Sequence, residues 1–147
     1  MNLRIQIEDF DIGTECDALA GSGGHVGAIA TFVGLVRGDD ALIALSLEHY
    51  PGMTEREIGR HVQEAQMRWP LLGVTIIHRI GRLLPGARIV FVGVAASHRG
   101  AAFEACEFLM DYLKTRAPFW KQEERPQGIA WVEARVSDDN AAQRWRQ

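Results

Sequence analysis

Residues 88–96 read Arg-Ile-Val-Phe-Val-Gly-Val-Ala-Ala, a run in which only the first residue is charged. A strand with one face in water alternates polar and apolar residues, whereas a strand covered on both faces is apolar throughout. The run therefore predicts a central strand of a sheet. A long helix is expected after it, with Ser97 as its cap, His98 or Arg99 as its first residue and Pro118 as its stop. Its apolar residues recur at intervals of three and four positions: Phe103, Cys106, Met110, Leu113 and Ala117.

Apolar patterns predict the remaining strands on both sides of this segment. Branched and alternating apolar residues favour strands at 3–7, 25–36, 42–50, 74–80, 119–123 and 129–136. The strand at 42–50 is expected to form a hairpin with 25–36 across Gly38-Asp39-Asp40, and residues 81–86 are expected to form a turn.

Two more helices precede the central strand. A short one is expected at residues 12–20. A longer one has Thr54 as N-cap, with Glu57 completing a capping box, and ends before Pro70. Its apolar face comprises Ile58, Val62, Ala65 and Trp69. The polar tail at 137–147 is expected to be frayed or weakly helical.

Length and composition favour one α+β domain over residues 1–147. Of the 147 residues, 47% are hydrophobic, enough for a core without disulfides. Strands and helices are mixed along the chain, and no repeat or linker divides it. The net charge of -3 argues against a general nucleic-acid surface. No apolar run approaches a membrane span and the N-terminus lacks a signal-peptide pattern, so we expect a cytoplasmic protein.

Familiar catalytic motifs are missing from the sequence. The two cysteines, Cys16 and Cys106, lie far apart without a CxxC pattern, so neither a disulfide framework nor a zinc site is expected. The sequence also lacks a P-loop, a GxGxxG turn, a GxSxG elbow and an HExxH helix. Arg, His and Lys remain as candidates, and they predict a site for a small anion without a metal or cofactor.

Three groups of cationic residues compete for this role. Ser97-His98-Arg99 stands where the buried strand meets the long helix, and unpaired N–H groups at a helix start attract phosphate or carboxylate. The alternative is that Ser97 caps the helix while the other two residues are solvated. Arg37 is either an anion ligand or a turn arginine paired with Asp39 or Asp40. His78-Arg79 ends a strand, where a structural role is favoured.

The lysines are the second type of candidate. A lysine in a last helical turn, such as Lys114, ordinarily compensates the helix dipole. Lys114 and Lys121, however, flank Pro118 and two aromatic residues, and a lysine held against an apolar wall can bind an anion or act as nucleophile or base. His98 and Lys114 are separated by about 24 Å of helix, at ~1.5 Å per residue. They can serve one small ligand only if two subunits pair about a twofold axis.

Longer motifs occur in order along the chain: FVGLVR at 32–37, LEHYPGMTE at 47–55, HRIG at 78–81, SHR at 97–99 and MDYLKTRAPFWK at 110–121. Together they resemble the catalytic large subunit of molybdopterin synthase, over about residues 25 to 136. The resemblance implies an α/β hammerhead-like fold with a mixed, largely antiparallel sheet and two main helices.

The resemblance also implies an activity and its partners. The family transfers sulfur to cyclic pyranopterin monophosphate, or precursor Z, and so makes the dithiolene of molybdopterin for the molybdenum cofactor. The sulfur arrives as a C-terminal thiocarboxylate on a small ubiquitin-like partner ending in Gly-Gly. The assembly is a heterotetramer, in which a homodimer of large subunits carries one small subunit at each end.

Site residues follow by matching positions. Lys114 and Lys121 match the catalytic lysines, and Lys114, on a rigid helix, is expected to be the more severe loss. The substrate-binding positions are Leu35, Val36, Arg37, His98, Arg99, Gln122, Glu123 and Arg135. The resemblance implies that His98 and Arg99 come from the neighbouring subunit. The loop at 38–41 is shorter than in the family, so contacts that depend on it are not carried over.

Two other interpretations are open from the residues alone. The chain can be a non-catalytic dimeric module that binds a phosphorylated pterin or nucleotide through His98 and Arg99. It can also be a general interaction subunit, whose partner binding is insensitive to the anion site. Cys106 is expected to be a core residue in each case.

Overall fold

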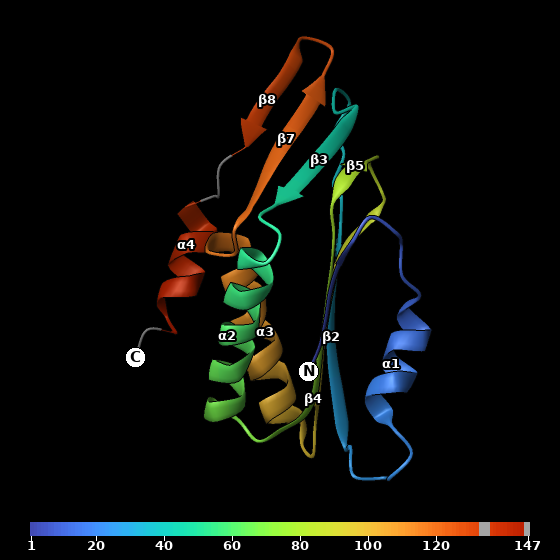
Figure 1. Ribbon diagram of the computed structural model, residues 1–147, viewed down its shortest axis with the longest axis vertical. Helices are drawn as coiled ribbons and strands as arrows, with labels where there is room; N and C mark the ends of the chain where they lie inside the picture. Colours follow the sequence, from blue (N-terminus) through green and yellow to red (C-terminus); the bar gives the residue numbers. More distant parts are fainter. Residues whose placement is uncertain (133–135, 146–147) are drawn as a thin grey trace.

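The computed structural model describes residues 1–132 and 136–145 and arranges their strands in two sheets (Figure 1). The larger sheet has the order β1-β4-β6-β2, formed by Asn2–Gln6 (β1), Leu71–Arg79 (β4), Arg88–Ala96 (β6) and Ala28–Leu35 (β2). The smaller sheet has the order β5-β3-β7-β8, formed by Gly81–Leu83 (β5), Ala44–His49 (β3), Phe119–Arg125 (β7) and Gly128–Val132 (β8). β1 and β4 run parallel, and the other described strand pairs are antiparallel. The predicted α+β class with largely antiparallel pairing is confirmed.

Helices cover both faces of the larger sheet (Figure 1). Ile12–Ala20 (α1) lies on one face, and Met53–Arg68 (α2) and Arg99–Thr115 (α3) lie on the other. Val136–Gln143 (α4) packs against α3. In the described part of the chain, no helix combines the length and the apolarity needed to span a membrane.

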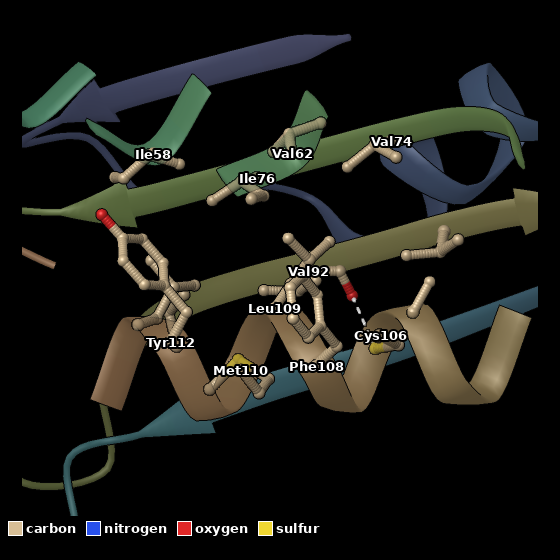
Figure 2. Packing of buried hydrophobic residues seen from close by; sticks show 14 of the residues in the cluster. Ile58, Val62, Val74, Ile76, Val92, Cys106, Phe108, Leu109, Met110 and Tyr112 are labelled. Atoms are coloured by element: carbon tan, nitrogen blue, oxygen red, sulfur yellow. Dashed lines mark hydrogen bonds between the residues drawn. The ribbon is translucent and has the colours of Figure 1, made fainter. Parts of the chain in front are cut away.

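Strand β6 lies in the middle of the larger sheet, between β4 and β2. Val92 faces α3, next to Leu109 and Cys106, whose thiol donates a hydrogen bond of 3.8 Å to the Val92 carbonyl oxygen (Figure 2). Its neighbour Phe91 faces the opposite way and packs with Phe10 on the α1 side. The prediction of a strand buried on both faces, and of Cys106 as a core residue, is confirmed.

Gly93 explains how closely α1 approaches this strand. A Cβ at position 93 would lie 2.5 Å from Cδ1 of Leu19, a distance that non-bonded carbon atoms do not reach. A side chain at Gly93 would therefore require the end of the Leu19 side chain, and the Phe91 ring 2.8 Å away, to shift.

The predicted hairpin between 25–36 and 42–50 is wrong. β2 pairs with β6, whereas β3 pairs with β5 and β7, so these two strands belong to different sheets. The reason lies in the connection: Asp39 accepts hydrogen bonds from the N–H groups of Ala41 and Leu42 and from the guanidinium of Arg125, at the end of β7. The connection is thereby tied to the smaller sheet.

Helix α2 begins differently from the prediction. Its N-cap is Gly52, whose φ of +86° favours glycine, and the Gly52 N–H donates to the Glu55 carboxylate at 3.1 Å. Thr54 lies inside the helix, and Glu57 pairs with Arg60 instead of closing a capping box. The predicted apolar face is otherwise correct, because Ile58, Val62 and Ala65 are buried.

Helix α3 also differs at its start. The N-cap position is His98 and no side chain caps the helix, so the predicted role of Ser97 is wrong. Phe103, predicted as a core residue, is 65% exposed, because α3 turns Ala102, Ala105 and Leu109 toward the sheet instead.

Two strand predictions need smaller corrections. Part of the expected turn at 81–86 forms β5, which pairs with β3. The strand expected at 129–136 ends at Val132, and Val136 already belongs to α4. The helical alternative for the tail is therefore correct over residues 137–143, and residues 146–147 lie outside the described residues.

Candidate active site

A two-lobed cavity lies where α3 ends between the two sheets. The inner lobe has a volume of about 220 Å³ and is lined mainly by apolar side chains, among them Leu47, Val90, Met110, Leu113 and Phe119. The outer lobe is larger, about 600 Å³, and more polar, with Leu35, Val36, Arg37, Asp39, Glu123 and Arg125 in its lining. Lys114 and Lys121 line both lobes. Both amino groups therefore belong to the junction between an apolar and a polar space.

The fold brings these lysines together from two elements. Lys114 is in the last turn of α3, and Lys121 lies in β7, in register with Leu47 of β3 and Val132 of β8. Between them the chain reverses at Ala117 and Pro118, so that two residues seven positions apart face one cavity. The resemblance paired them, and the structure places both in the cavity lining.

The amino-acid composition also sets Lys114 and Lys121 apart from the other basic residues. Lys114 and Lys121 are the only lysines in the sequence, whereas every other basic side chain among the sixteen is arginine. Arginine serves well for surface ion pairs, but only the lysine amine readily loses its proton or acts as a nucleophile. Both lysines of the sequence therefore line one cavity.

Arg37 follows β2 and lines the outer lobe with Leu35 and Val36, as the sequence analysis expects. The alternative of a turn arginine is wrong, because the ion pairs of the described residues join Arg37 to neither Asp39 nor Asp40, and Asp39 pairs with Arg125 instead. Both carboxylate oxygens of Asp39 accept hydrogen bonds from Arg125, each at 3.0 Å. These bonds, with further ones from backbone N–H groups, lower the pKa of Asp39 to about 2. Arg125 closes the short loop after Arg37 and leaves the Arg37 side chain in the lining of the lobe.

Glu123 and Gln122 are separated by the pleat of β7. Glu123 lines the outer lobe and pairs with Arg125 at 2.9 Å. Gln122 is in register with Ser46 and Trp131 and contributes to neither lobe. Successive residues of a strand face opposite ways, so the structure brings Glu123 but not Gln122 to the cavity.

The other predicted ligands lie elsewhere. His98 and Arg99 are exposed at the start of α3, the length of that helix away from Lys114. One chain therefore does not place them beside the lysines. Arg135 lies outside the described residues.

A shallow groove runs along α3 and β2 between these two ends of the helix. It has a volume of about 580 Å³, and Phe32, Phe103, Cys106 and Met110 contribute to its lining, with Lys114 at one end. Phe103 is exposed on this surface, as Phe32 is. Exposed aromatic side chains beside a groove are typical of a surface that another chain covers.

His78 lines the cavity, although the sequence favoured a structural role for it. It is 7% exposed, lines the inner lobe and stacks on Phe119 with ring centroids 3.9 Å apart. Burial lowers the pKa of His78 to about 4, and the charges of Lys121 and Lys114 act in the same direction. The signal was its spacing: His78 follows Ile76 by two positions and therefore shares the face of β4 that turns toward α3.

Its neighbour Arg79 has the structural role that the sequence favoured. The guanidinium donates to the backbone carbonyls of Ile7 and Arg88, at 3.0 and 2.9 Å. Two adjacent pairs of titratable residues, Glu48-His49 and Glu123-Glu124, also have ordinary partners: Trp120 donates to Glu48 and Arg82 donates to Glu124.

Comparison with known proteins assigns the family. The family model for the MoaE protein matches residues 5–116. A molybdopterin synthase catalytic subunit of Pseudomonas aeruginosa is 55% identical over the whole of both chains. The one of Escherichia coli is 57% identical and covers 94% of this chain and 93% of its own. Among solved structures, the molybdopterin biosynthesis MoaE protein of Burkholderia ambifaria has a TM-score of 0.85 at 54% identity, covering 98% of this chain and 97% of its own.

These findings confirm the resemblance that the motifs carried. The fold, the length and the sequence agree over nearly the whole chain, and the curated relatives are named as catalytic subunits. The expectation of an enzyme of molybdopterin synthesis is confirmed with them. The chain is a member of the MoaE protein family.

Proposed function

We propose that this chain transfers sulfur from the C-terminal thiocarboxylate of a small ubiquitin-like partner to cyclic pyranopterin monophosphate, and so makes molybdopterin. The observation that carries the proposal is the position of Lys114 and Lys121 between an apolar lobe and a polar, arginine-containing lobe. Two reactants of different character can meet there at the same amino groups. The name of the relatives, catalytic subunit, fits an enzyme that works with a second protein.

Each lobe suits one reactant. The inner lobe is narrow and apolar, which suits a Gly-Gly tail without side chains. The outer lobe has room for a pterin, and Arg37 can hold its phosphate through charge-assisted hydrogen bonds. Leu35, Val36 and Glu123 are proposed to contact the same substrate.

The lysines fit the chemistry of such a transfer. The thiocarboxylate sulfur bonds to a side-chain carbon of the pterin while the bond from that carbon to an oxygen of the cyclic phosphate breaks; the phosphate ring opens to a monoester, and a thioester joins pterin and partner. Water then attacks the thioester carbonyl, the carbon–sulfur bond to the partner breaks, and the partner leaves as a carboxylate while the sulfur stays on the pterin. Ammonium groups at the junction attract the thiocarboxylate and stabilise the oxyanion of the hydrolysis step. A second loaded partner supplies the second sulfur.

His98 and Arg99 enter this site from a second copy of the chain. A twofold pairing across the groove of α3 and β2 would place the start of one helix near the end of the other. The exposed Phe103 and Phe32 would then be covered. We propose a homodimer of this kind as the core of a heterotetramer with two small subunits, and Arg135 as a further substrate contact; Gln122, which faces away from the cavity, is not proposed as one.

The cavity also bears on domain organisation and location. Because its lining comes from both sheets and from α3, we propose that residues 1–147 act as one domain. The free thiols of Cys16 and Cys106 suit a reducing compartment, and we propose that the protein is cytoplasmic.

Reconstitution tests the function directly. The chain is mixed with cyclic pyranopterin monophosphate and a thiocarboxylated Gly-Gly partner, and dithiolene product is detected by mass and by fluorescence after oxidation. We expect product that requires both proteins and both lysines. If the partner binds and keeps its thiocarboxylate while no product forms, the sulfur-transfer function is wrong and the non-catalytic binding module becomes the better interpretation.

A further inference from the structure

One stripe of helix α3 faces the groove that this helix forms with β2. The residues of the stripe recur at helical spacing and all contribute to the lining of the groove: Phe103, Cys106, Glu107, Met110, Asp111 and Lys114. Asp111 and Lys114 are neighbours on this stripe, because residues three positions apart on a helix have Cβ atoms about 5–6 Å from each other. Lys114 also lines both lobes of the cavity. A carboxylate therefore stands one helical turn from a lysine of the candidate active site.

Asp111 is a competitor for the charge of Lys114. Opposite charges three or four positions apart on a helix attract each other. Pairing with Asp111 would draw the Lys114 ammonium along the surface of α3, away from the lobes of the cavity. Within residues 1–132 and 136–145, however, the ion pair of Asp111 is made with Arg144, and none joins Asp111 to Lys114.

The segment that follows α4 holds the Asp111 carboxylate. Nη2 of Arg144 donates a hydrogen bond to Oδ2 of Asp111 at 3.0 Å, and the same guanidinium pairs with Glu107. The indole N–H of Trp145 donates to the same Oδ2 at 2.5 Å. Only 16% of the Asp111 side chain is exposed. Solvent therefore screens the charge of this carboxylate weakly, and Arg144 is the cation that compensates it.

Trp145 is fixed by contacts that do not involve Asp111. The guanidinium of Arg68, on α2, donates a hydrogen bond of 2.6 Å to the backbone carbonyl oxygen of Trp145. The indole packs edge-on against Trp69 and Phe108, with ring centroids 5.8 and 5.5 Å apart. The guanidinium carbon of Arg144 lies 4.8 Å from the centroid of the same indole. These contacts fix the place of Arg144 beside the stripe of α3.

We propose that Arg144 is a positioning residue: it neutralises the Asp111 carboxylate, so that the Lys114 ammonium serves the cavity instead of pairing along the helix. Arg144 lines neither lobe and acts through Asp111. The catalytic part of this inference rests on the proposed sulfur transfer, whereas the competition between Arg144 and Lys114 for Asp111 does not.

Double variants separate this role from simple anchoring of the C-terminal segment. Arg144→Ala frees two carboxylates, those of Asp111 and Glu107. Adding Asp111→Asn removes the charge next to Lys114 and keeps an oxygen that accepts the Trp145 N–H. Adding Glu107→Gln is the matched control, because Glu107 lies seven positions from Lys114, about two helical turns away. Competition for the lysine is relieved by the first addition alone, whereas a loosened C-terminal segment is relieved by neither.

The first measurement uses the chain without its partner and requires no activity. The chain is treated with limiting acetic anhydride, and trypsin, which cleaves at the arginine between Lys114 and Lys121, separates the two lysines for mass spectrometry. Only the uncharged amine is acetylated, and a neighbouring carboxylate stabilises the charged form. Labelling of Lys114 relative to Lys121 should therefore fall by about twofold to threefold in Arg144→Ala.

The double variants decide the meaning of this change. Labelling of Lys114 should return to the wild-type ratio when Asp111→Asn is added to Arg144→Ala, and should stay low when Glu107→Gln is added. Unchanged labelling in Arg144→Ala overturns the inference. A decrease that Asp111→Asn does not relieve, or that Glu107→Gln relieves equally, overturns it as well.

The second measurement uses the chain with its loaded partner. Single-turnover product formation should fall by about twofold to threefold in Arg144→Ala and recover when Asp111→Asn is added. Arg60→Ala, which breaks an exposed ion pair with Glu57 on α2, should behave as wild type. Normal turnover in Arg144→Ala overturns the positioning role. Absence of product with the wild-type chain overturns the proposed function instead, and the labelling ratio still decides whether Asp111 competes for Lys114.

Discussion

The hydroxyl of Thr54 donates a hydrogen bond of 3.0 Å to the carbonyl oxygen of Pro118. The Thr54 hydroxyl oxygen in turn accepts a hydrogen bond from the backbone N–H of Tyr50, also at 3.0 Å. Thr54 is fully buried in the first turn of α2, and Pro118 lies in the chain reversal between Lys114 and Lys121. One side chain thus couples the start of α2 to the segment that sets the spacing of the two lysines.

Thr54→Val should cost about 2 kcal/mol of the free energy of unfolding, because the Pro118 carbonyl and the Tyr50 N–H lose a buried partner. Urea denaturation measures this cost. Product formation should also fall at temperatures where this variant is fully folded. The reason is that the chain reversal at Pro118, between Lys114 and Lys121, is then held less firmly. Thr31→Val, at an exposed position of β2, is the control. Equal stabilities of the two variants would show that the Thr54 bonds contribute little.

Lys114→Ala should lower kcat by about a hundredfold to a thousandfold, as expected for loss of a group that stabilises an oxyanion. We expect a smaller loss in Lys121→Ala, because Lys114 is on the more rigid element. Steady-state kinetics with loaded partner give both values, and pterin binding is measured separately. Arg116→Ala removes a nearby charge that does not line either lobe and should be close to wild type. A larger loss of kcat in Lys121→Ala than in Lys114→Ala would contradict this expectation.

Activity should be restored by mixing two inactive variants. Lys114→Ala supplies an intact start of α3, and the double variant His98→Ala with Arg99→Ala supplies intact lysines. Random pairing at equal amounts gives one complete site in about a quarter of the positions, so about a quarter of wild-type activity is expected. The test requires subunit exchange, which mass spectrometry of labelled chains verifies. If exchanged mixtures stay inactive, the site is not shared between copies.

Acid titration should reveal the bond between Asp39 and Arg125. Hydrogen bonds from Arg125 lower the pKa of Asp39 from 3.8 to about 2 in the folded chain. A lowered folded-state pKa stabilises the protein above the unfolded value and the effect is lost as pH falls through the folded value. The stability difference between wild type and Asp39→Asn should therefore be full above about pH 4 and disappear toward pH 2.

The exposed Asp40 provides the comparison for this titration. Asp40→Asn should show no such pH dependence, because its carboxylate is not the one that Arg125 holds. Asp39→Asn should also raise the KM for the pterin, since the loop after Arg37 is no longer tied to β7. A pH-independent difference for Asp39→Asn would contradict the assignment.

Local patterns predicted the elements well where neighbours in sequence decide the outcome. The bounds of α1 and β6 agree with the prediction, because the periodicity of apolar residues depends only on which faces are buried. The pairing of β3 was not predictable in this way, since Asp39 reaches Arg125, 86 positions along the chain, to place the connection on the other sheet. The cap at Gly52 was missed because a positive φ leaves no periodic signal.

The residues of the candidate site were likewise predicted to different extents. Lys114, Lys121 and Arg37 were found through long motifs, and their spacing alone left structural roles open. A structural role was favoured for His78 because the pair His78-Arg79 ends a strand next to Gly81. Only the tertiary structure shows that its face of β4 opens into the cavity that both lysines line.

The burial of Cys106 bears on whether sulfur from the partner can be diverted to a thiol of this chain. Its thiol points into the core beside Val92, and burial raises its pKa to about 11. Cys16 lies across the larger sheet, on α1, and neither cysteine lines the described cavity. An acyl group activated by sulfur is readily captured by a nearby thiolate. Although Cys106 shares the groove along α3 and β2 with Lys114, neither lobe of the cavity is lined by a cysteine, so an incoming thioacid meets no resident sulfur there with which to exchange its cargo.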